Sequence, residues 1–255
     1  MRDTDSDWRK IADADPYFGV LTHDRFSRSN LTQQTRDEFY ASGEHNMAHV
    51  VAELKSCLDD DFAPTRALDF GCGVGRLTLA MAAYANEVVG LDVAPGMLKE
   101  AEAERDARGI SSVSFSTSMP DGRFDWISSI IVFQHIPPPR GLQLLDEMLA
   151  RLAPRGVISL HFPLYRERRS EHLLPPLEEA LYFRYSGDQL TVLKENPHDV
   201  ANASVLGRMR TYDYDLTAIV ARLFEVGISR PTLIQAEQDG WQGARIYGRR
   251  LVEQG

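Results

Sequence analysis

The sequence predicts a doubly wound α/β fold around a mostly parallel sheet. From about residue 66, short apolar runs alternate with amphipathic stretches of helical spacing. The run Phe124–Val132 is almost continuously apolar, as expected of a strand covered by helices on both faces. Glycines occupy alternate positions 71, 73 and 75, directly after the first apolar run. The junction of a strand and a helix is where sheets of this kind bind ligands.

Five strands are expected in this part of the chain, at residues 67–70, 87–92, 113–116, 124–132 and 157–162. Between them, Leu77–Ala85 is rich in alanine and leucine and has no helix breaker. Pro95 suits the first turn of the next helix, which should end near Gly109. Leucines at helical spacing predict a further helix over 142–152, and residues 154–156 should turn the chain into the fifth strand. Right-handed crossovers between parallel strands follow from this order.

The two ends of the chain differ from the middle. Residues 1–61 are expected to form an N-terminal helical cap, because apolar residues at 47, 50, 51, 54 and 58 define one amphipathic helix. Residues 62–255 form the main domain, in which 163–211 is an irregular insertion after the fifth strand and a candidate lid over the substrate. Asp215 should cap a helix that ends at Gly227. A terminal β-hairpin is expected to follow that helix.

Composition limits the possible functions. The 255 residues carry a net charge of −9, which argues against general affinity for nucleic acid or an anionic membrane. The chain has two cysteines, and their positions suggest neither a disulfide nor a zinc site. No run is apolar for the roughly 18 residues that a membrane span needs, and the start of the chain is acidic and polar. We therefore expect a cytoplasmic protein with no metal, nucleic-acid or membrane partner.

The glycine turn predicts the class of ligand. Glycine permits positive φ and close approach of the backbone, and the helix that follows adds free N–H groups. Asp92 ends the second strand 21 residues after Gly71, at the spacing of an acid that binds a ribose. The glycines follow a G-x-G-x-G pattern and not G-x-G-x-x-G, and Asp69 lies two residues before the first of them. An acid there would repel a pyrophosphate but suits ammonium and sulfonium charges, which favours S-adenosylmethionine over NAD.

At this level of detail the sequence resembles the class I S-adenosylmethionine-dependent methyltransferases. Residues 68–75, Leu-Asp-Phe-Gly-Cys-Gly-Val-Gly, are similar to that superfamily's first motif, and residues 89–98 to its second. Residues 124–127 and 132–137 resemble the fourth strand and the loop after it. Residues 152–156 resemble the turn before strand five, with Arg155 where the family usually has glycine. The resemblance implies the Rossmann-like methyltransferase fold, whose seven-stranded sheet ends in an antiparallel hairpin.

The resemblance also implies a set of cofactor-binding residues. Asp69, Gly71 and Gly73 would line the methionine end of the cofactor, and Asp92 its ribose. Asp69 could alternatively only cap the turn, and Met97 could be plain helix core instead of a neighbour of the adenine. Ser118 belongs to a loop where the family often has an aspartate that meets the adenine amino group, and that acid is missing here. The complete expected set is Tyr17, Asp69, Gly71, Cys72, Gly73, Gly75, Arg76, Asp92, Val93, Met97, Ser118 and Phe133.

Three aromatic residues have competing interpretations. His135 follows the fourth strand and, with an ordinary pKa near 6.5, suits a general base, but it could equally shape the loop. His161, at the end of the fifth strand, is a second candidate, for which a structural role is the alternative. Tyr17 lies where relatives carry an N-terminal lid and could stabilise a sulfonium through its ring, or it could anchor helix packing.

The predicted function is methyl transfer from S-adenosylmethionine to a small metabolite, a natural-product intermediate or a peptide. The Asn-Pro-Pro-Tyr tetrad of methyltransferases that act on nucleic-acid bases or glutamine amides is absent from the sequence. One alternative is a regulatory or scaffold protein that binds the cofactor without catalysis. Another is a nicotinamide-dependent oxidoreductase, against which the glycine spacing and Asp69 argue. The sequence does not identify the methyl acceptor.

Overall fold

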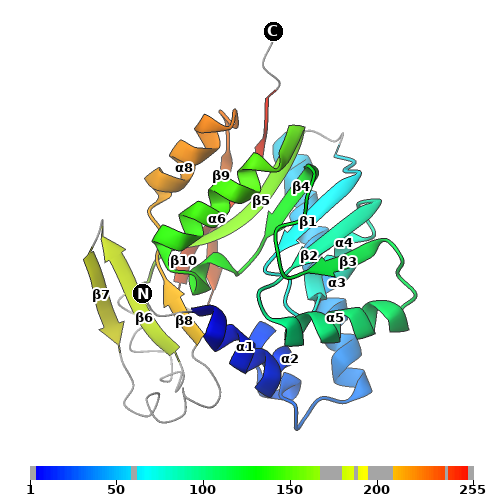
Figure 1. Cartoon of the computed structure of the whole chain (residues 1–255). Helices are drawn as coiled ribbons and strands as arrows, with labels where there is room; N and C mark the ends of the chain where they lie inside the picture. Colours follow the sequence, from blue (N-terminus) through cyan, green and yellow to red (C-terminus); the bar gives the residue numbers. More distant parts are fainter. Residues whose placement is uncertain are drawn as a thin grey trace.

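A seven-stranded sheet runs through the computed structural model, which describes residues 4–58, 62–166, 180–186, 189–194, 209–238 and 241–251 (Figure 1). The strand order is β3-β2-β1-β4-β5-β10-β9. Neighbours from β3 to β5 pair in parallel, and β10 is antiparallel to both β5 and β9. The predicted doubly wound, mostly parallel sheet is confirmed. Its strands are β1 (Arg66–Phe70), β2 (Glu87–Leu91), β3 (Val113–Ser116), β4 (Phe124–Ser129), β5 (Leu152–Arg166), β9 (Thr232–Gln238) and β10 (Trp241–Arg249).

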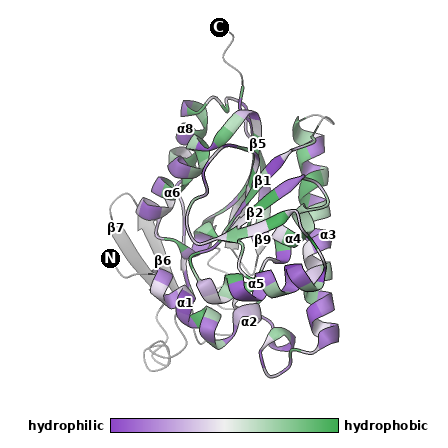
Figure 2. Ribbon diagram, turned by 45° about the vertical axis from the view of Figure 1, so that its right-hand side comes forward, coloured by the Kyte–Doolittle hydropathy of each residue, from purple (hydrophilic) through white to green (hydrophobic). Residues whose placement is uncertain are grey.

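Helices cover both faces of this sheet. Ala67 and Leu68 are adjacent in β1 but belong to two separate hydrophobic clusters, because successive strand side chains point to opposite faces. Figure 2 shows hydrophilic and hydrophobic colours on different faces of the covering helices. The first cluster packs against α3 (Gln33–Leu58), α4 (Arg76–Met81) and the start of α5 (Pro95–Ala107), and the second against α6 (Pro138–Ala150) and α8 (Leu216–Glu225).

Two of the predicted strands, the fourth and the fifth, have ends that were wrong for local reasons. β4 stops at Ser129 and not at Val132, because the chain turns at Ile131, which has a φ of 61°. β5 begins at Leu152, before the predicted turn, and residues 153–156 bulge out of its pairing with β4. Arg155 has a φ of 63° in this bulge, a conformation that favours glycine.

The expected irregular insertion contains a second sheet. Strands β6 (Ala180–Ser186), β7 (Gln189–Lys194) and β8 (Met209–Tyr212) pair in the order β7-β6-β8. The prediction of irregular chain was therefore wrong for these residues, whose Tyr, Phe, Val and Thr content suits strands. The remainder of 163–211 beyond Arg166 lies outside the described residues, as do the hairpin residues 239–240.

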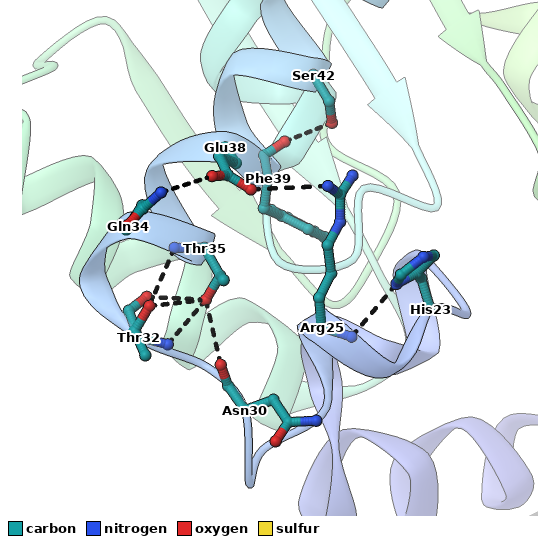
Figure 3. A network of polar contacts seen from close by, with 9 residues as sticks. All are labelled: His23, Arg25, Asn30, Thr32, Gln34, Thr35, Glu38, Phe39 and Ser42. Carbon is teal, nitrogen blue, oxygen red and sulfur yellow. Dashed lines mark hydrogen bonds and ion pairs between the residues drawn. The ribbon is translucent and has the colours of Figure 1, made fainter.

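The N-terminal segment is mainly helical, as predicted. It consists of α1 (Thr4–Ala14), α2 (Pro16–Val20), a short 3-10 helix at Asp24–Phe26, and α3. Figure 3 shows how α3 begins: Thr32 and Thr35 exchange hydrogen bonds between side chain and backbone, at 2.8 and 3.2 Å. This reciprocal arrangement satisfies free N–H groups at the helix start. An ion pair of 3.6 Å between Arg25 and Glu38 ties the 3-10 helix to α3.

The C-terminal elements follow the predicted signals. Asp215 caps α8 by accepting a hydrogen bond of 2.8 Å from the Thr217 N–H, and Gly227 follows the helix with a φ of 86°. Strands β9 and β10 then form the antiparallel hairpin. Within the described ranges, no helix is both long and apolar enough to span a bilayer. The same residues contain no group of three or more histidine, cysteine or acidic side chains placed to hold a metal.

Candidate functional site

The turn between β1 and α4 has the conformation that its glycines predict. Gly71, Gly73 and Gly75 have φ values of 76°, 53° and 79°. The Gly71 and Cys72 N–H groups both donate to the Leu91 carbonyl, at 2.7 and 3.0 Å, which ties the turn to the end of β2. A Cβ on Gly71 would collide with Val132, and a Cβ on Gly73 would lie 2.7 Å from Val20. Only glycine lets the backbone follow this path with those neighbours in place.

Asp92 fixes the turn from the neighbouring strand. One of its carboxylate oxygens accepts the Gly73 N–H and the other the Ala94 N–H, each at 2.9 Å. Burial raises the pKa of the carboxyl, although these hydrogen bonds oppose the shift. Each oxygen has two lone pairs, so both retain an acceptor position for a ligand.

Asp69 lies at the bottom of the same turn and is almost fully buried. The Thr78 hydroxyl on α4 donates to its carboxylate at 2.6 Å. Burial raises the pKa of Asp69 to about 6, against the opposing effects of this hydrogen bond and of the Arg76 charge. Arg76 is itself buried, and desolvation lowers its pKa to about 10. Within the described residues, its Nε has no hydrogen-bond partner. The site therefore contains a buried carboxylate and a buried guanidinium, and both groups retain hydrogen-bonding capacity for a ligand.

A cavity opens at the carboxyl ends of β1, β2 and β4, where the glycine turn meets the N-terminal helices. Most of the residues predicted to bind the cofactor line it, together with the candidate base. These are Asp69, Gly71, Cys72, Gly73, Arg76, Asp92, Val93, Met97 and His135. The structure thus brings together residues from three strand ends.

Four predicted residues do not line this cavity. Tyr17 is 2% exposed and packs edge-on against Phe39, which is the anchor interpretation and not the sulfonium contact. Phe133 is fully buried and stacks on Phe162. Gly75 is the N-cap of α4, where a Cβ would crowd Ala101 at 3.1 Å. Ser118 is exposed and bonds within its own loop.

His135 lines the cavity in a position that leaves it a weak base. Its Nδ1 lies 2.8 Å from the Arg210 carbonyl and therefore carries the proton, so Nε2 accepts from the Gln134 amide at 3.0 Å. Burial lowers the pKa of His135 to about 4. The ring is neutral at pH 7, and its role as a base stays a prediction that this geometry disfavours. His161 does not line the cavity, and burial lowers its pKa to about 4 as well.

Helix α1 forms a wall that sequence reasoning did not assign to the site. Its Thr4, Asp5 and Trp8 line the cavity, and Trp8 contacts His135 edge-on with ring centroids 4.9 Å apart. Asp7, on the same helix, pairs with the buried Arg210 of β8 at 3.2 Å. Figure 1 shows α1 between β8 and α5. The cap and the second sheet therefore meet at the edge of the site, and no local sequence signal indicates this contact.

Comparison with known proteins agrees with this architecture. A family model described as "Methyltransferase domain" matches residues 67–156. The chain is 35% identical over 103 residues to a trans-aconitate 2-methyltransferase of Methylobacterium radiotolerans. This match covers 40% of this chain and 39% of that protein. It is 31% identical over 132 residues to the ajmaline N-methyltransferase of Rauvolfia serpentina, covering 48% and 45%. The matches thus span less than half of these curated relatives.

Solved structures extend the likeness to almost the whole chain. The magnesium protoporphyrin IX methyltransferase of Synechocystis PCC 6803, determined with bound S-adenosylmethionine, covers 98% of both chains with a TM-score of 0.59 and 17% identity. An amino pentose methyltransferase of Micromonospora echinaspora covers 87% of this chain and 98% of its own, with a TM-score of 0.55 and 16% identity. The fold is therefore the Rossmann-like methyltransferase fold. Within this fold, residues 67–156 are similar to the methyltransferase domain that the family model describes.

Proposed function

We propose that this protein transfers a methyl group from S-adenosylmethionine to a small-molecule acceptor. The observation that carries the proposal is the pair of acids, the buried Asp69 and the half-buried Asp92, beside a glycine turn with positive φ that lines the cavity. Two negative charges held in place by hydrogen bonds suit a ligand with both cationic groups and a ribose. The match of residues 67–156 to a methyltransferase domain supports the same conclusion.

The residues present fit this cofactor. Asp92 would accept the ribose hydroxyls with its remaining lone pairs, and Asp69 would face the cationic methionine end. Arg76, with a buried guanidinium that has an unused N–H, would pair with the methionine carboxylate. Val93 and Met97 would provide apolar contacts for the adenine. When bound, the cofactor supplies an activated methyl group on a positively charged sulfur.

The protein's main contribution is then alignment of the acceptor with that methyl group. Holding two reactants in line can lower a barrier by about 7–11 kcal/mol. His135 would position the loop after β4 by its hydrogen bonds to Arg210 and Gln134, since its low pKa makes it a poor proton acceptor. An acceptor that is already nucleophilic at neutral pH needs no base.

The first finer point of the proposal is the class of acceptor. We infer that the acceptor is a metabolite or natural-product intermediate, with a peptide as the alternative. Relatives named for small molecules, among them trans-aconitate and ajmaline, support the first class.

The second finer point is the organisation of the chain. We also propose that residues 1–61 act as a cap and 163–211 as a lid on the domain formed by residues 62–255. The contact of α1 with β8 supports this division of roles.

The cofactor is tested directly by calorimetry with S-adenosylmethionine, S-adenosylhomocysteine and NAD. The first two should bind, and Asp92→Asn should weaken them, because an amide can accept only one of the two N–H groups that the carboxylate now accepts. The matched control is Asp37→Asn, at an exposed position of α3, and this variant should bind the cofactor as the wild type does. Binding of NAD alone would replace the proposal with the oxidoreductase alternative. Cofactor binding without release of methyl groups to any acceptor in a metabolite panel would favour the regulatory alternative.

A further inference from the structure

An arginine and an aspartate form an ion pair in the wall of the cavity, between helices α6 and α1. The two Nη atoms of Arg140 on α6 contact the two carboxylate oxygens of Asp5 on α1, at 2.9 and 2.7 Å. Both residues line the cavity. This two-pronged geometry is the one in which arginine recognises carboxylates with the greatest strength and directionality. The cavity wall therefore contains a carboxylate-binding site, formed by Arg140, in which the carboxylate of Asp5 is bound.

Both partners of this ion pair are partly exposed to solvent. The side chains of Arg140 and Asp5 are 41% and 21% exposed, so neither charge depends entirely on the other for stabilisation. Asp5 also lies in the first turn of α1, where the helix dipole stabilises a negative charge whether or not Arg140 is paired. The start of α1 would therefore still stabilise the Asp5 charge if another carboxylate took its place at Arg140.

The surroundings of Arg140 suit the rest of an organic acid. Leu144 lies one turn further along α6, and the Trp8 ring lies one turn beyond Asp5 on α1; both line the cavity. Glu147 follows two turns after Arg140, on the same cavity wall. An apolar group beside the anchored carboxylate would be buried against Trp8 and Leu144, whereas a second carboxylate near Glu147 would be repelled.

We propose that Arg140 anchors a carboxylate of the methyl acceptor, and that Asp5 holds this position until the acceptor binds. The acceptor is then an organic acid with one carboxylate at this end and an apolar body. This inference rests on the proposed function, because the acceptor must share the cavity with the methyl donor. Arg140 acts as a specificity-determining residue that orients the acceptor.

A purely structural role for the ion pair predicts a different outcome. If the pair only fastens α1 to α6, loss of either partner should loosen the same contact and change ligand binding in the same direction. If Asp5 competes with the acceptor, loss of Asp5 should strengthen binding of an acid, and loss of Arg140 should weaken it. The opposite signs separate the two interpretations.

The test is calorimetry on the full chain saturated with S-adenosylhomocysteine, with 4-phenylbutyrate as the probe and 4-phenylbutyramide as its uncharged match. Asp5→Asn should bind the acid about fivefold more tightly than the wild type, the effect of removing a partly exposed ion pair. Arg140→Gln should bind it at least about tenfold more weakly. Arg140→Lys should also bind weakly, because an ammonium does not form the two-pronged contact, and it serves if the glutamine variant fails to fold. The amide should respond to none of these changes.

Two matched variants control for charge alone. Asp13→Asn removes an exposed acid from α1, and Arg151→Gln removes a base from the end of α6; neither residue lines the cavity. Both should bind the acid as the wild type does. Equal shifts in Asp5→Asn and Arg140→Gln, or failure of wild type and Asp5→Asn to bind the acid, would overturn the anchor while leaving the methyl donor site standing. Failure of the wild type to bind S-adenosylhomocysteine would instead overturn the proposed function itself.

Discussion

Binding of S-adenosylmethionine should weaken as the pH falls below 6, because Asp69 must be ionised to face a cationic ligand. Burial raises the pKa of this carboxyl from an ordinary 3.8 to about 6. A ligand that prefers the ionised form lowers this pKa on binding, so by linkage its affinity falls as protons compete for the site. Because Asp69 must lose its proton for binding, the affinity for S-adenosylmethionine should be full above about pH 7 and should fall progressively below pH 6.

The size of the effect follows from the raised pKa. With a pKa of about 6, only about one Asp69 in eleven is ionised at pH 5, so affinity at pH 5 should be about tenfold lower than the plateau. At its ordinary pKa of 3.8, the same group would be ionised in more than about nine molecules in ten at pH 5, and affinity would hardly change. Calorimetry at pH 5, 6, 7 and 8 distinguishes these cases, with circular dichroism at each pH to show that the protein stays folded.

The variant Asp69→Asn isolates this residue from Asp92, whose pKa burial also raises. An asparagine oxygen can still accept the Thr78 hydrogen bond, so the turn should keep its shape. The variant should bind the cofactor weakly at every pH and lose most of the pH dependence. A flat profile in the wild type, or the same steep profile in the variant, would refute the assignment of Asp69 to the cationic end of the cofactor.

Three further outcomes are expected. Arg155→Gly should raise the free energy of unfolding by about 1 kcal/mol in urea titrations, because glycine accepts the φ of 63° without strain; a destabilised variant would contradict this. Since burial lowers the pKa of His135 from 6.5 to about 4, the protein should lose up to about 3 kcal/mol of stability as the pH falls from 6.5 to 4, and His135→Gln should lose less over the same range. Equal acid sensitivity of both proteins would refute that explanation. Gly71→Ala should abolish cofactor binding and lower stability by about 1–3 kcal/mol, since its Cβ collides with Val132 at a positive φ; normal binding by calorimetry would contradict the tight fit of the turn.

The part of the cavity around the glycine turn, where we propose that the methyl donor binds, could be predicted because its geometry is encoded locally. Gly71 and Gly73 are the residue type that adopts the positive φ values of the turn. Asp92 accepts a hydrogen bond from the Gly73 N–H at the end of a strand whose length and spacing are evident in the sequence. Asp69 is the next-to-last residue of the first strand, so its side chain lies close to the turn whatever the remainder of the chain does. Strand order and crossover direction then follow from general rules for parallel sheets.

The remaining wall could not be predicted, because it depends on contacts between distant segments. Asp5 and Arg140 are separated by 135 residues, and neither lies in a motif. Tyr17 shows the converse problem: its place in the chain suggested a lid, but an aromatic ring gains more by packing against Phe39 in the cap than by facing the cavity. The strands of the second sheet were missed because the prolines before β6 and between β7 and β8 outweighed the strand-forming residues of the strands themselves.

The two halves of the cavity are therefore specified by different kinds of interaction, and this has a consequence for acceptor choice. The donor half depends on backbone φ values and N–H groups at Gly71 and Gly73, for which few substitutions are tolerated. The opposite half depends on side chains such as Trp8 and Arg140, brought together by ion pairs that one substitution can remove or reverse. Changes in α1 and α6 can thus alter which acceptor binds without disturbing the donor. Burial is the main cause of the raised pKa of Asp92, but the Asp5 charge also contributes to it, so substitutions at these two residues should not have strictly additive effects on binding.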